Sequence, residues 1–355
     1  MSRPAFAPDS CVVAEVTPSP NHGERKDGRR VDMIVLHYTG MSDAEAALER
    51  LKARGSEVSS HYFVFEDGRI MQLVQESRRA WHAGKSFWAG ETDINSCSIG
   101  IEIANPGHDH GYPNFPKRQI AAVTALCRSI QTRNTIPPVR VVAHSDIAPA
   151  RKQDPGEKFP WRTLHESGVG HWVKPAAIMD FGQALRLGDR GDAVAALQKS
   201  LGDYGYGVEA SGEYDALTRD VVVAFQRHFR PERIDGIADP STRSTLQELL
   251  ATRGRPGPSP GGPLPLARAR LRSLPLDCAA YRPHPCWGQS AGRPLRQNRK
   301  VAGEESPGSM DKRCRITSGG CESRDSATEN RPPGSAFGRD AVRVKRCGKS
   351  APRRR

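Results

Sequence analysis

Short apolar runs bounded by turn residues recur through the first half of the chain and predict a β-sheet. Residues 31–37 form an apolar run that ends on a histidine, as a buried strand does where it reaches the edge of a sheet. Residues 61–65 and 70–74 flank a Glu-Asp-Gly-Arg sequence, which predicts a β-hairpin. Residues 98–103 and 139–143 have the composition of two further strands.

Two helices are predicted between these strands. Ser42 stands three residues before Glu45, which is a capping-box signature for a helix over residues 42–53. A longer helix is predicted where apolar residues repeat at helical spacing, at Ile120, Val123, Leu126 and Ile130. The alternation over residues 20–165 predicts one α/β domain with helices packed on a sheet, and residues 1–19 are assigned to an N-terminal extension.

The next part of the chain changes character. Residues 166–183 contain several Gly and Pro residues without a sustained period and are interpreted as a linker. Residues 184–250 predict a small domain of three helices. Its strongest pattern is an apolar stripe at Leu217, Val221, Phe225 and Phe229. Pro240 is suited to the first position of the last helix.

Residues 251–355 keep neither a helical nor a strand period and predict a disordered tail, because they cannot bury enough apolar surface to offset the entropy of ordering. The 355-residue chain has a formal net charge of +13, and residues 255–355 hold 22 of its 53 Lys and Arg but 8 of its 40 Asp and Glu. Two alternatives stay open for this segment. It is a basic tail that binds nucleic acid or other anionic polymers without specificity, or a frameshifted segment that was never a selected sequence.

Side chains that can bind a metal follow two of the predicted strands. His37 ends one strand, His144 follows another, and Asp154 stands in the next loop. Two neutral imidazoles and one carboxylate are a suitable zinc ligand set, with a fourth position left for water. Spacing alone is weak evidence, since the two histidines are far apart in the chain and each one alone reads as an ordinary core or surface residue.

Two further residues have the chemistry of amide hydrolysis. Glu102 is embedded in the apolar run Ile99-Gly-Ile-Glu-Ile103. It is either a solvent-facing residue of an alternating strand or a general base that moves a proton from an activated water to a leaving amine. Lys152 precedes Asp154 by two residues and could stabilise an oxyanion, although most lysines are merely solvated.

Five ordered motifs within residues 20–165 resemble the zinc-dependent N-acetylmuramoyl-L-alanine amidases of the type-2 family, which includes the phage T7 type of lysozyme and the peptidoglycan-recognition proteins. The motifs are Leu36-His-Tyr-Thr39, Trp81-His-Ala-Gly84, Ser98-Ile-Gly-Ile-Glu102, Ala143-His-Ser-Asp146 and Lys152-Gln-Asp-Pro-Gly156. The resemblance implies a mixed central sheet flanked by helices, with a zinc site at the floor of a groove.

Residue by residue, the resemblance implies one Zn²⁺ per chain held by His37, His144 and Asp154. It implies acid/base and oxyanion roles for Glu102 and Lys152. The residues expected to line the groove or bind substrate are Trp81, His82, Asn105 and His61, and the two histidines among them are alternatively structural. The phage branch has a tyrosine where this chain has Ser60, so no catalytic tyrosine is assigned.

The three-helix segment is similar to the peptidoglycan-binding module of many cell-wall hydrolases. The resemblance is carried by Leu185 to Gly191, by Gly212-Glu-Tyr214 and by the following helix through Phe225-Gln226. The alternative is a helical bundle with a structural role only.

The expected function is hydrolysis of the amide between N-acetylmuramic acid and L-alanine in peptidoglycan or muropeptides, and the alternative is a non-catalytic peptidoglycan-recognition protein. We expect a monomer without a specific nucleic-acid partner. No apolar run is long enough for a transmembrane helix or an ordinary secretory signal, which favours the cytoplasm, whereas the wall-binding module favours the periplasm. The sequence leaves the compartment open, as it does the choice between polymeric and anhydro-muropeptide substrates.

Overall fold

The computed structural model describes residues 6–179 and 181–254. The predicted disordered tail lies outside the described residues except for its first four positions, and so do the first five residues of the predicted N-terminal extension. No helix in the described part of the chain is long and apolar enough to span a membrane.

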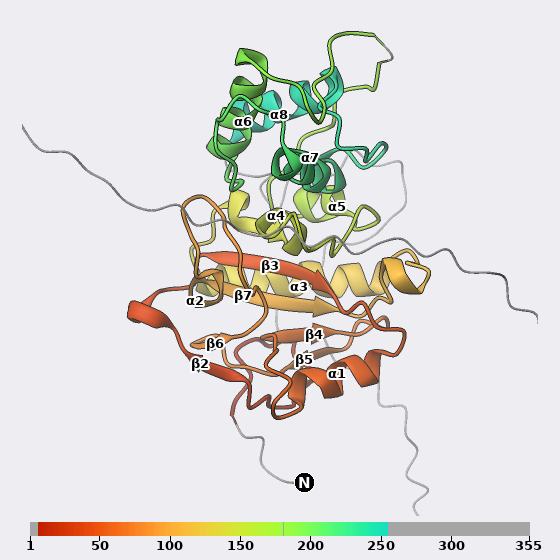
Figure 1. The fold of residues 1–355 in the computed structure, drawn as a ribbon. Coiled ribbons are helices and arrows are strands. Elements are labelled where there is room, and N and C mark those ends of the chain that lie inside the picture. Colours follow the sequence, from red (N-terminus) through yellow and green to blue (C-terminus); the bar gives the residue numbers. More distant parts are fainter. Residues whose placement is uncertain (1–5, 180, 255–355) are drawn as a thin grey trace, which may run out of the picture. The chain divides into compact units, whose positions relative to one another are not determined.

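A six-stranded mixed sheet forms the centre of the first domain (Figure 1). In spatial order the strands are β1 (Glu15–Val16), β5 (Ile70–Gln72), β4 (Tyr62–Val64), β7 (Ser98–Ile103), β3 (Met33–Tyr38) and β8 (Val141–Ala143). The four strands β4, β7, β3 and β8 are parallel, and β5 returns antiparallel to β4. The predicted α/β class is confirmed.

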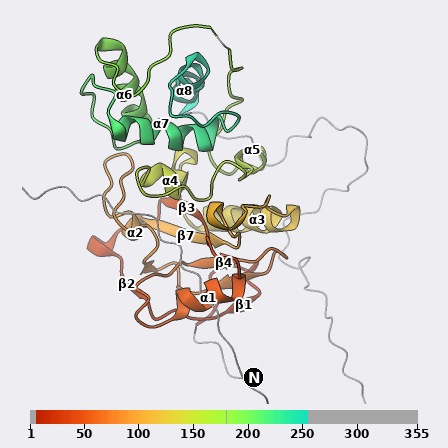
Figure 2. The same ribbon diagram turned by 45° about the vertical axis from the view of Figure 1, so that its right-hand side comes forward.

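The sheet is covered on both faces (Figures 1 and 2). Helix α3 (Lys117–Arg133) packs its apolar stripe on the face formed by alternate residues such as Ile34, Leu36 and Ile101. Helix α1 (Ala44–Lys52) packs on the opposite face, against Phe63 and other residues of β4 and β5. Helix α4 (His144–Ile147) packs on that same opposite face beside β3 and β8, where Val35 and Val142 contact Ile147.

Shorter elements complete the first domain. They are the two-stranded antiparallel sheet of β2 (His22–Glu24) and β6 (Arg78–Ala80), the short helices α2 (Ile94–Cys97) and α5 (Trp161–Glu166), and the 3-10 turns η1 (Lys26–Gly28), η2 (His108–His110) and η3 (Pro138–Arg140). Strand β1 lies within the segment that the sequence analysis set apart as an N-terminal extension, and it pairs with β5.

Two local predictions can be compared directly with the structure. The hairpin is confirmed, and its turn places Gly68 at φ +89°, a conformation that favours glycine. The capping prediction is wrong by one residue, because Asp43 rather than Ser42 is the N-cap of α1 and accepts a hydrogen bond from the backbone N–H of Ala46 at 3.1 Å. A carboxylate one residue later satisfies the same free N–H groups at the helix start.

The three predicted helices of the second domain are α6 (Asp192–Tyr204), α7 (Ala216–Phe229) and α8 (Pro240–Thr252). Asp215 and Asp239 cap the last two, and Pro240 occupies the first turn of α8 as predicted. The apolar stripe of α7 is buried at Val221, Phe225 and Phe229, but Leu217 is 41% exposed. The predicted stripe is one turn too long at its start, because Thr218 rather than Leu217 is the buried residue in the first turn of α7.

A buried polar cluster joins α4 to the helical domain. The Asp146 carboxylate accepts hydrogen bonds from the Tyr206 hydroxyl at 2.8 Å and from His228 Nδ1 at 2.7 Å. All three side chains are at least 96% buried. Trp88 packs edge-on against Tyr206, with ring centroids 5.0 Å apart, so apolar contacts surround the polar ones. The helical domain therefore packs on the short helix that begins at His144.

We expect Tyr206→Phe to lower the free energy of unfolding by about 1.5–3 kcal/mol, because it removes a hydrogen bond to a buried carboxylate. Tyr214→Phe is the matched control, since Tyr214 is equally buried and its hydroxyl donates to the neutral Gly236 carbonyl at 2.9 Å. That control should lose only about 0.5–1.5 kcal/mol. Urea unfolding of both variants measures the difference, and equal losses would contradict this account of the contact.

Candidate functional site

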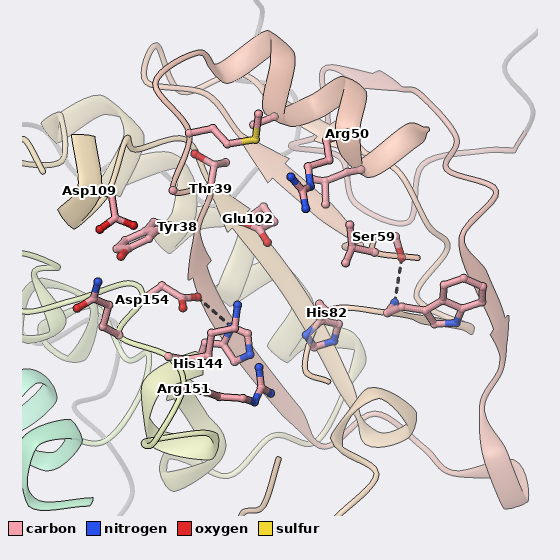
Figure 3. A pocket seen from close by; sticks show the side chains of 18 residues that line it. Tyr38, Thr39, Arg50, Ser59, His82, Glu102, Asp109, His144, Arg151 and Asp154 are labelled. Carbon is pink, nitrogen blue, oxygen red and sulfur yellow. Dashed lines mark hydrogen bonds and ion pairs between the residues drawn. The ribbon is translucent and has the colours of Figure 1, made fainter. Parts of the chain in front are cut away.

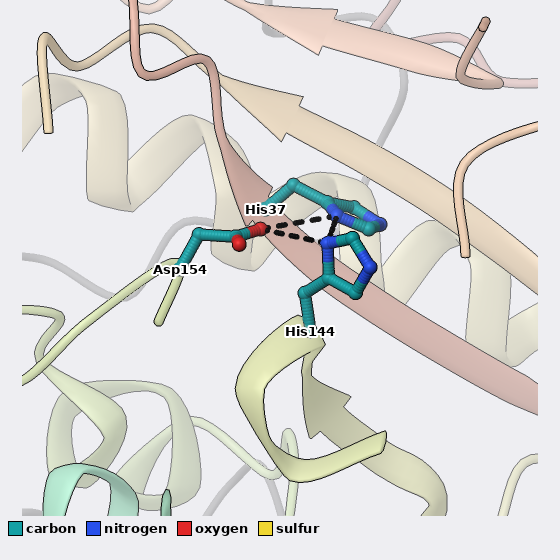
Figure 4. Close-up of side chains that lie close together, drawn as sticks. All are labelled: His37, His144 and Asp154. Atoms are coloured by element: carbon teal, nitrogen blue, oxygen red, sulfur yellow. Dashed lines mark hydrogen bonds and ion pairs between the residues drawn. The ribbon is translucent and has the colours of Figure 1, made fainter. Parts of the chain in front are cut away.

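Three side chains meet at the carboxyl edge of the parallel strands (Figure 4). His37 lies near the end of β3, and His144 follows β8, the strand that pairs with β3 in parallel. Asp154 comes from the loop that follows α4. Neighbouring parallel strands end at the same edge of a sheet, and this brings the two histidines together although they are far apart in the sequence.

The three ligand atoms are close enough to share one ion. His37 Nδ1 lies 2.9 Å from His144 Nδ1 and 3.2 Å from an oxygen of Asp154, and His144 Nδ1 lies 3.0 Å from the same oxygen. Ligands about 2.0–2.2 Å from a tetrahedral zinc ion are separated by roughly 3.3–3.6 Å. All three residues are buried. The residues present therefore fit a zinc ion or a similar divalent cation.

Protonation states at this cluster agree with metal binding. His144 Nε2 lies 3.2 Å from the Ala83 carbonyl, which can only accept, so Nε2 donates to it and a neutral ring would present its Nδ1 lone pair to a cation in the cluster. Burial lowers the pKa of His37 to about 4 and keeps its ring neutral. Burial opposes ionisation of Asp154, but the two imidazoles outweigh it and hold the pKa of that carboxyl well below its usual range.

Glu102 is the residue opposite His37 in the parallel register of β3 and β7. Its Oε2 atom is buried and has no hydrogen-bond partner in the described part of the chain. Burial, with a further contribution from the Asp154 charge, raises the pKa of Glu102 to about 8. An unpartnered carboxylate with a raised pKa beside a metal-ligand cluster is a candidate for proton transfer.

A groove opens over this cluster and runs between α1 and the loop of Asp154 (Figure 3). Of the residues predicted from the sequence, Glu102, Lys152 and Trp81 line it, and His82 lies at its floor with 9% of its surface exposed. The structure does not bring Asn105 and His61 to the groove. Asn105 is buried with its amide bonded to the Pro113 carbonyl, and His61 accepts from the backbone N–H of Gly100.

Several groove residues were missed by the sequence analysis. Tyr38 directly follows the candidate ligand His37, and Arg50 stands on the exposed side of α1. Arg151 also lines the groove, and its guanidinium bonds to the carbonyls of Ala83 and Lys85. The place of Tyr38 directly after His37 in the Leu-His-Tyr-Thr motif could have indicated that this side chain lines the groove. Nothing in the sequence around Arg50 indicates that α1 forms a groove wall.

The fold and this site define an α/β amidase with a two-histidine, one-aspartate cluster at the sheet edge. The family model described as N-acetylmuramoyl-L-alanine amidase matches residues 27–157, and a model for a peptidoglycan binding domain matches residues 190–254. The N-acetylmuramoyl-L-alanine amidase AmiD of Escherichia coli K12 is 39% identical over 241 residues, which cover 64% of this chain and 84% of that protein.

Two solved structures are also similar. One is the E. coli AmiD amidase in complex with the substrate anhydro-N-acetylmuramic acid-L-Ala-D-gamma-Glu-L-Lys, with 37% identity, a TM-score of 0.54 and coverage of 63% of this chain and 90% of that chain. The other is AmpDh3 from Pseudomonas aeruginosa in complex with anhydromuramic pentapeptide, with 34% identity, a TM-score of 0.51 and coverage of 62% and 92%. The chain belongs to the type-2 family of N-acetylmuramoyl-L-alanine amidases and carries a peptidoglycan-binding domain.

Acid should destabilise the metal-free protein through His61. Burial, followed by the Arg25 charge, lowers the pKa of His61 to about 3. Above pH 6.5 the ring is neutral whether the chain is folded or not. Below that pH His61 becomes protonated in the unfolded chain but stays neutral in the folded one. The free energy of unfolding therefore falls as the pH is lowered, until the pH reaches about 3. At pH 5.0 this single group should cost about 2 kcal/mol.

Urea unfolding at pH 7.0 and 5.0 measures this loss in protein treated with a chelator. His61→Asn should reduce the pH dependence, whereas His110→Asn, at an exposed position, controls for the removal of a histidine. An unchanged pH dependence in the His61 variant would show that other groups account for the acid sensitivity.

Proposed function

We propose that this chain hydrolyses the amide between the lactyl group of N-acetylmuramic acid and the L-alanine of the stem peptide, with one zinc ion held by His37, His144 and Asp154. The observation that carries the proposal is the position of these three ligand atoms, within 4.8 Å of one another, beside the unpartnered carboxylate of Glu102. The anhydro-muropeptides bound to the two similar amidases support a muropeptide substrate here.

Each residue has a role that follows from its place in the groove. Zinc bound there would supply Lewis acidity toward the scissile carbonyl and the attacking water. Glu102 accepts the proton of that water and returns it to the leaving amine, which needs a carboxylate whose pKa is near the working pH. Lys152, which also lines the groove, contributes positive charge toward the oxyanion, and Trp81 offers an apolar surface to the glycan–peptide junction.

The helical domain is proposed to hold the enzyme on peptidoglycan. Its match to a peptidoglycan binding domain supports this role, and its contact with α4 places it next to the catalytic domain. Polymeric peptidoglycan is then a substrate beside soluble muropeptides. Comparing the release of stem peptide from sacculi and from anhydro-muropeptides measures the preference.

Metal removal should abolish hydrolysis. Chelator-treated protein is expected to lose at least about a thousandfold in kcat, since several kcal/mol of transition-state stabilisation would be withdrawn, and added zinc should restore it. Metal analysis should find one zinc per chain in the wild type and substoichiometric zinc in Asp154→Asn. Retained sacculus binding with no zinc and no release of stem peptide would favour the non-catalytic recognition protein instead.

Glu102→Gln should lower kcat by roughly 10²–10⁴, because the amide has nearly the same shape but cannot accept and return the proton. Zinc content should stay at the wild-type value, since Glu102 is outside the three-atom cluster. Glu166→Gln, at the end of α5, is the control for loss of a carboxylate away from the groove. If Glu102→Gln turns over muropeptide at the wild-type rate, the role of Glu102 is refuted.

A further inference from the structure

His82 connects the cluster to the protein interior through a chain of hydrogen bonds. Its Nδ1 atom lies 3.1 Å from Nε2 of His37, the ring nitrogen on the far side from the cluster. Its Nε2 atom lies 3.1 Å from the Ser98 hydroxyl, which is 2.6 Å from the Ile94 carbonyl. A continuous series of direct contacts therefore runs from the His37 ring to the Ile94 carbonyl.

The donors and acceptors in this series of hydrogen bonds can be assigned in only one consistent way. A carbonyl can only accept, so Ser98 donates to Ile94 and accepts from His82 Nε2–H. With Nε2 of His82 donating to Ser98, its Nδ1 atom is the one that faces His37, and a His37 ring that binds a cation through Nδ1 carries its proton on Nε2. The Nδ1 lone pair of His82 then accepts from His37 Nε2–H. His37 is left with its Nδ1 lone pair directed at His144 and Asp154.

The site for the His82 ring is built into the fold. The backbone N–H groups of His82 and Ala83 both donate to the side-chain oxygen of Asn95, at 3.1 and 2.9 Å. The ring lies over Gly100 of β7, where an added Cβ atom would stand 2.4 Å from the imidazole. Any larger residue at this position would displace the ring. The glycine between Ile99 and Ile101 is explained by this close approach.

We propose that His82 is a positioning residue, which fixes the tautomer and the ring plane of His37 through the hydrogen-bonded series His37–His82–Ser98. This inference rests on the proposed zinc site and goes beyond it, because His82 is neither one of the three ligands nor a group that reacts. It also replaces the expectation that His82 binds substrate, since both of its ring nitrogens are already occupied by protein partners. Partners that orient a ligand imidazole typically account for 10–100-fold in metal affinity.

The test compares variants that keep or remove the acceptor next to His37. His82→Leu fills the space without an acceptor and should weaken zinc binding by roughly 10–100-fold in a chelator competition. His82→Asn places an amide oxygen near the Nδ1 position and should recover most of that loss. Ser98→Ala frees the orientation of His82 and should give an intermediate loss. His165→Leu, on α5, controls for replacement of a histidine elsewhere in the domain.

Two readouts besides activity separate this role from others. Nitrogen-15 spectra of the metal-free wild type should show His37 protonated on Nε2, and this preference should disappear in His82→Leu. The KM for muropeptide, measured at saturating zinc, should stay unchanged. A raised KM with wild-type zinc affinity would make His82 a substrate contact, and a lowered melting temperature with wild-type zinc affinity would make it a packing residue. Either result overturns the proposal.

Failure of the inference can be told apart from failure of the proposed function. If the wild-type protein binds no zinc, both the proposed function and the proposed role of His82 are refuted. If the wild-type protein binds one zinc and hydrolyses muropeptide, and His82→Leu binds zinc equally tightly, only the role of His82 is removed.

Discussion

Desolvation of polar side chains at the edge of an apolar sheet is the constraint on which the rest of this structure depends. His37 and His144 are buried at the ends of largely apolar strands, and Asp154 is buried in the loop that follows α4. Burying such groups is costly unless each polar atom has a partner. A shared cation would supply that partner for the three inward-facing atoms. The outward-facing atoms are satisfied by the protein, as in the contact of His144 Nε2 with the Ala83 carbonyl.

The same requirement links the two domains. Helix α4 begins with the candidate ligand His144, and two residues later Asp146 is almost completely buried against the helical domain. Its carboxylate accepts hydrogen bonds from the Tyr206 hydroxyl and from His228 Nδ1 of that domain. It also accepts one from the backbone N–H of Ala143 in its own domain. These contacts place the helical domain directly against the short helix that begins at His144, two residues before Asp146.

Much of this arrangement could be predicted from the sequence, and the exceptions have physical causes. Apolar runs identified β3, β7 and the hairpin because their side chains are buried on both faces, so the pattern is continuous. The same pattern gave no sign that His37 and His144 meet, because parallel pairing joins segments far apart in the chain. The motif resemblance indicated them as ligands, and the structure provides the proximity. Strands β1 and β2 were missed because two or three residues are too few to show a period.

For some side chains the role depends on which other elements cover them. That role could not be inferred from the place of the residue in the sequence. Asn105 and His61 stand in motif-like surroundings, yet their polar atoms bond within the protein, to Pro113 and Gly100 among others. Leu217 fits a helical stripe but lines an open hollow beside Phe87 and Gly207, so it remains 41% exposed. Periodicity shows which residues share a face. It does not show where the neighbouring element ends.

Electrostatics around Glu102 show how the site and its ion depend on each other. In the protein alone, burial and the Asp154 charge raise the pKa of Glu102 to about 8, a value at which the carboxyl is mostly protonated at neutral pH. A protonated carboxyl cannot act as a base. A divalent cation held by His37, His144 and Asp154 would reverse the sign of the local charge and lower the pKa of the neighbouring carboxyl. In the proposed mechanism, ion binding would therefore prepare Glu102 to accept a proton, so that the proposed base would become competent only with the Lewis acid in place.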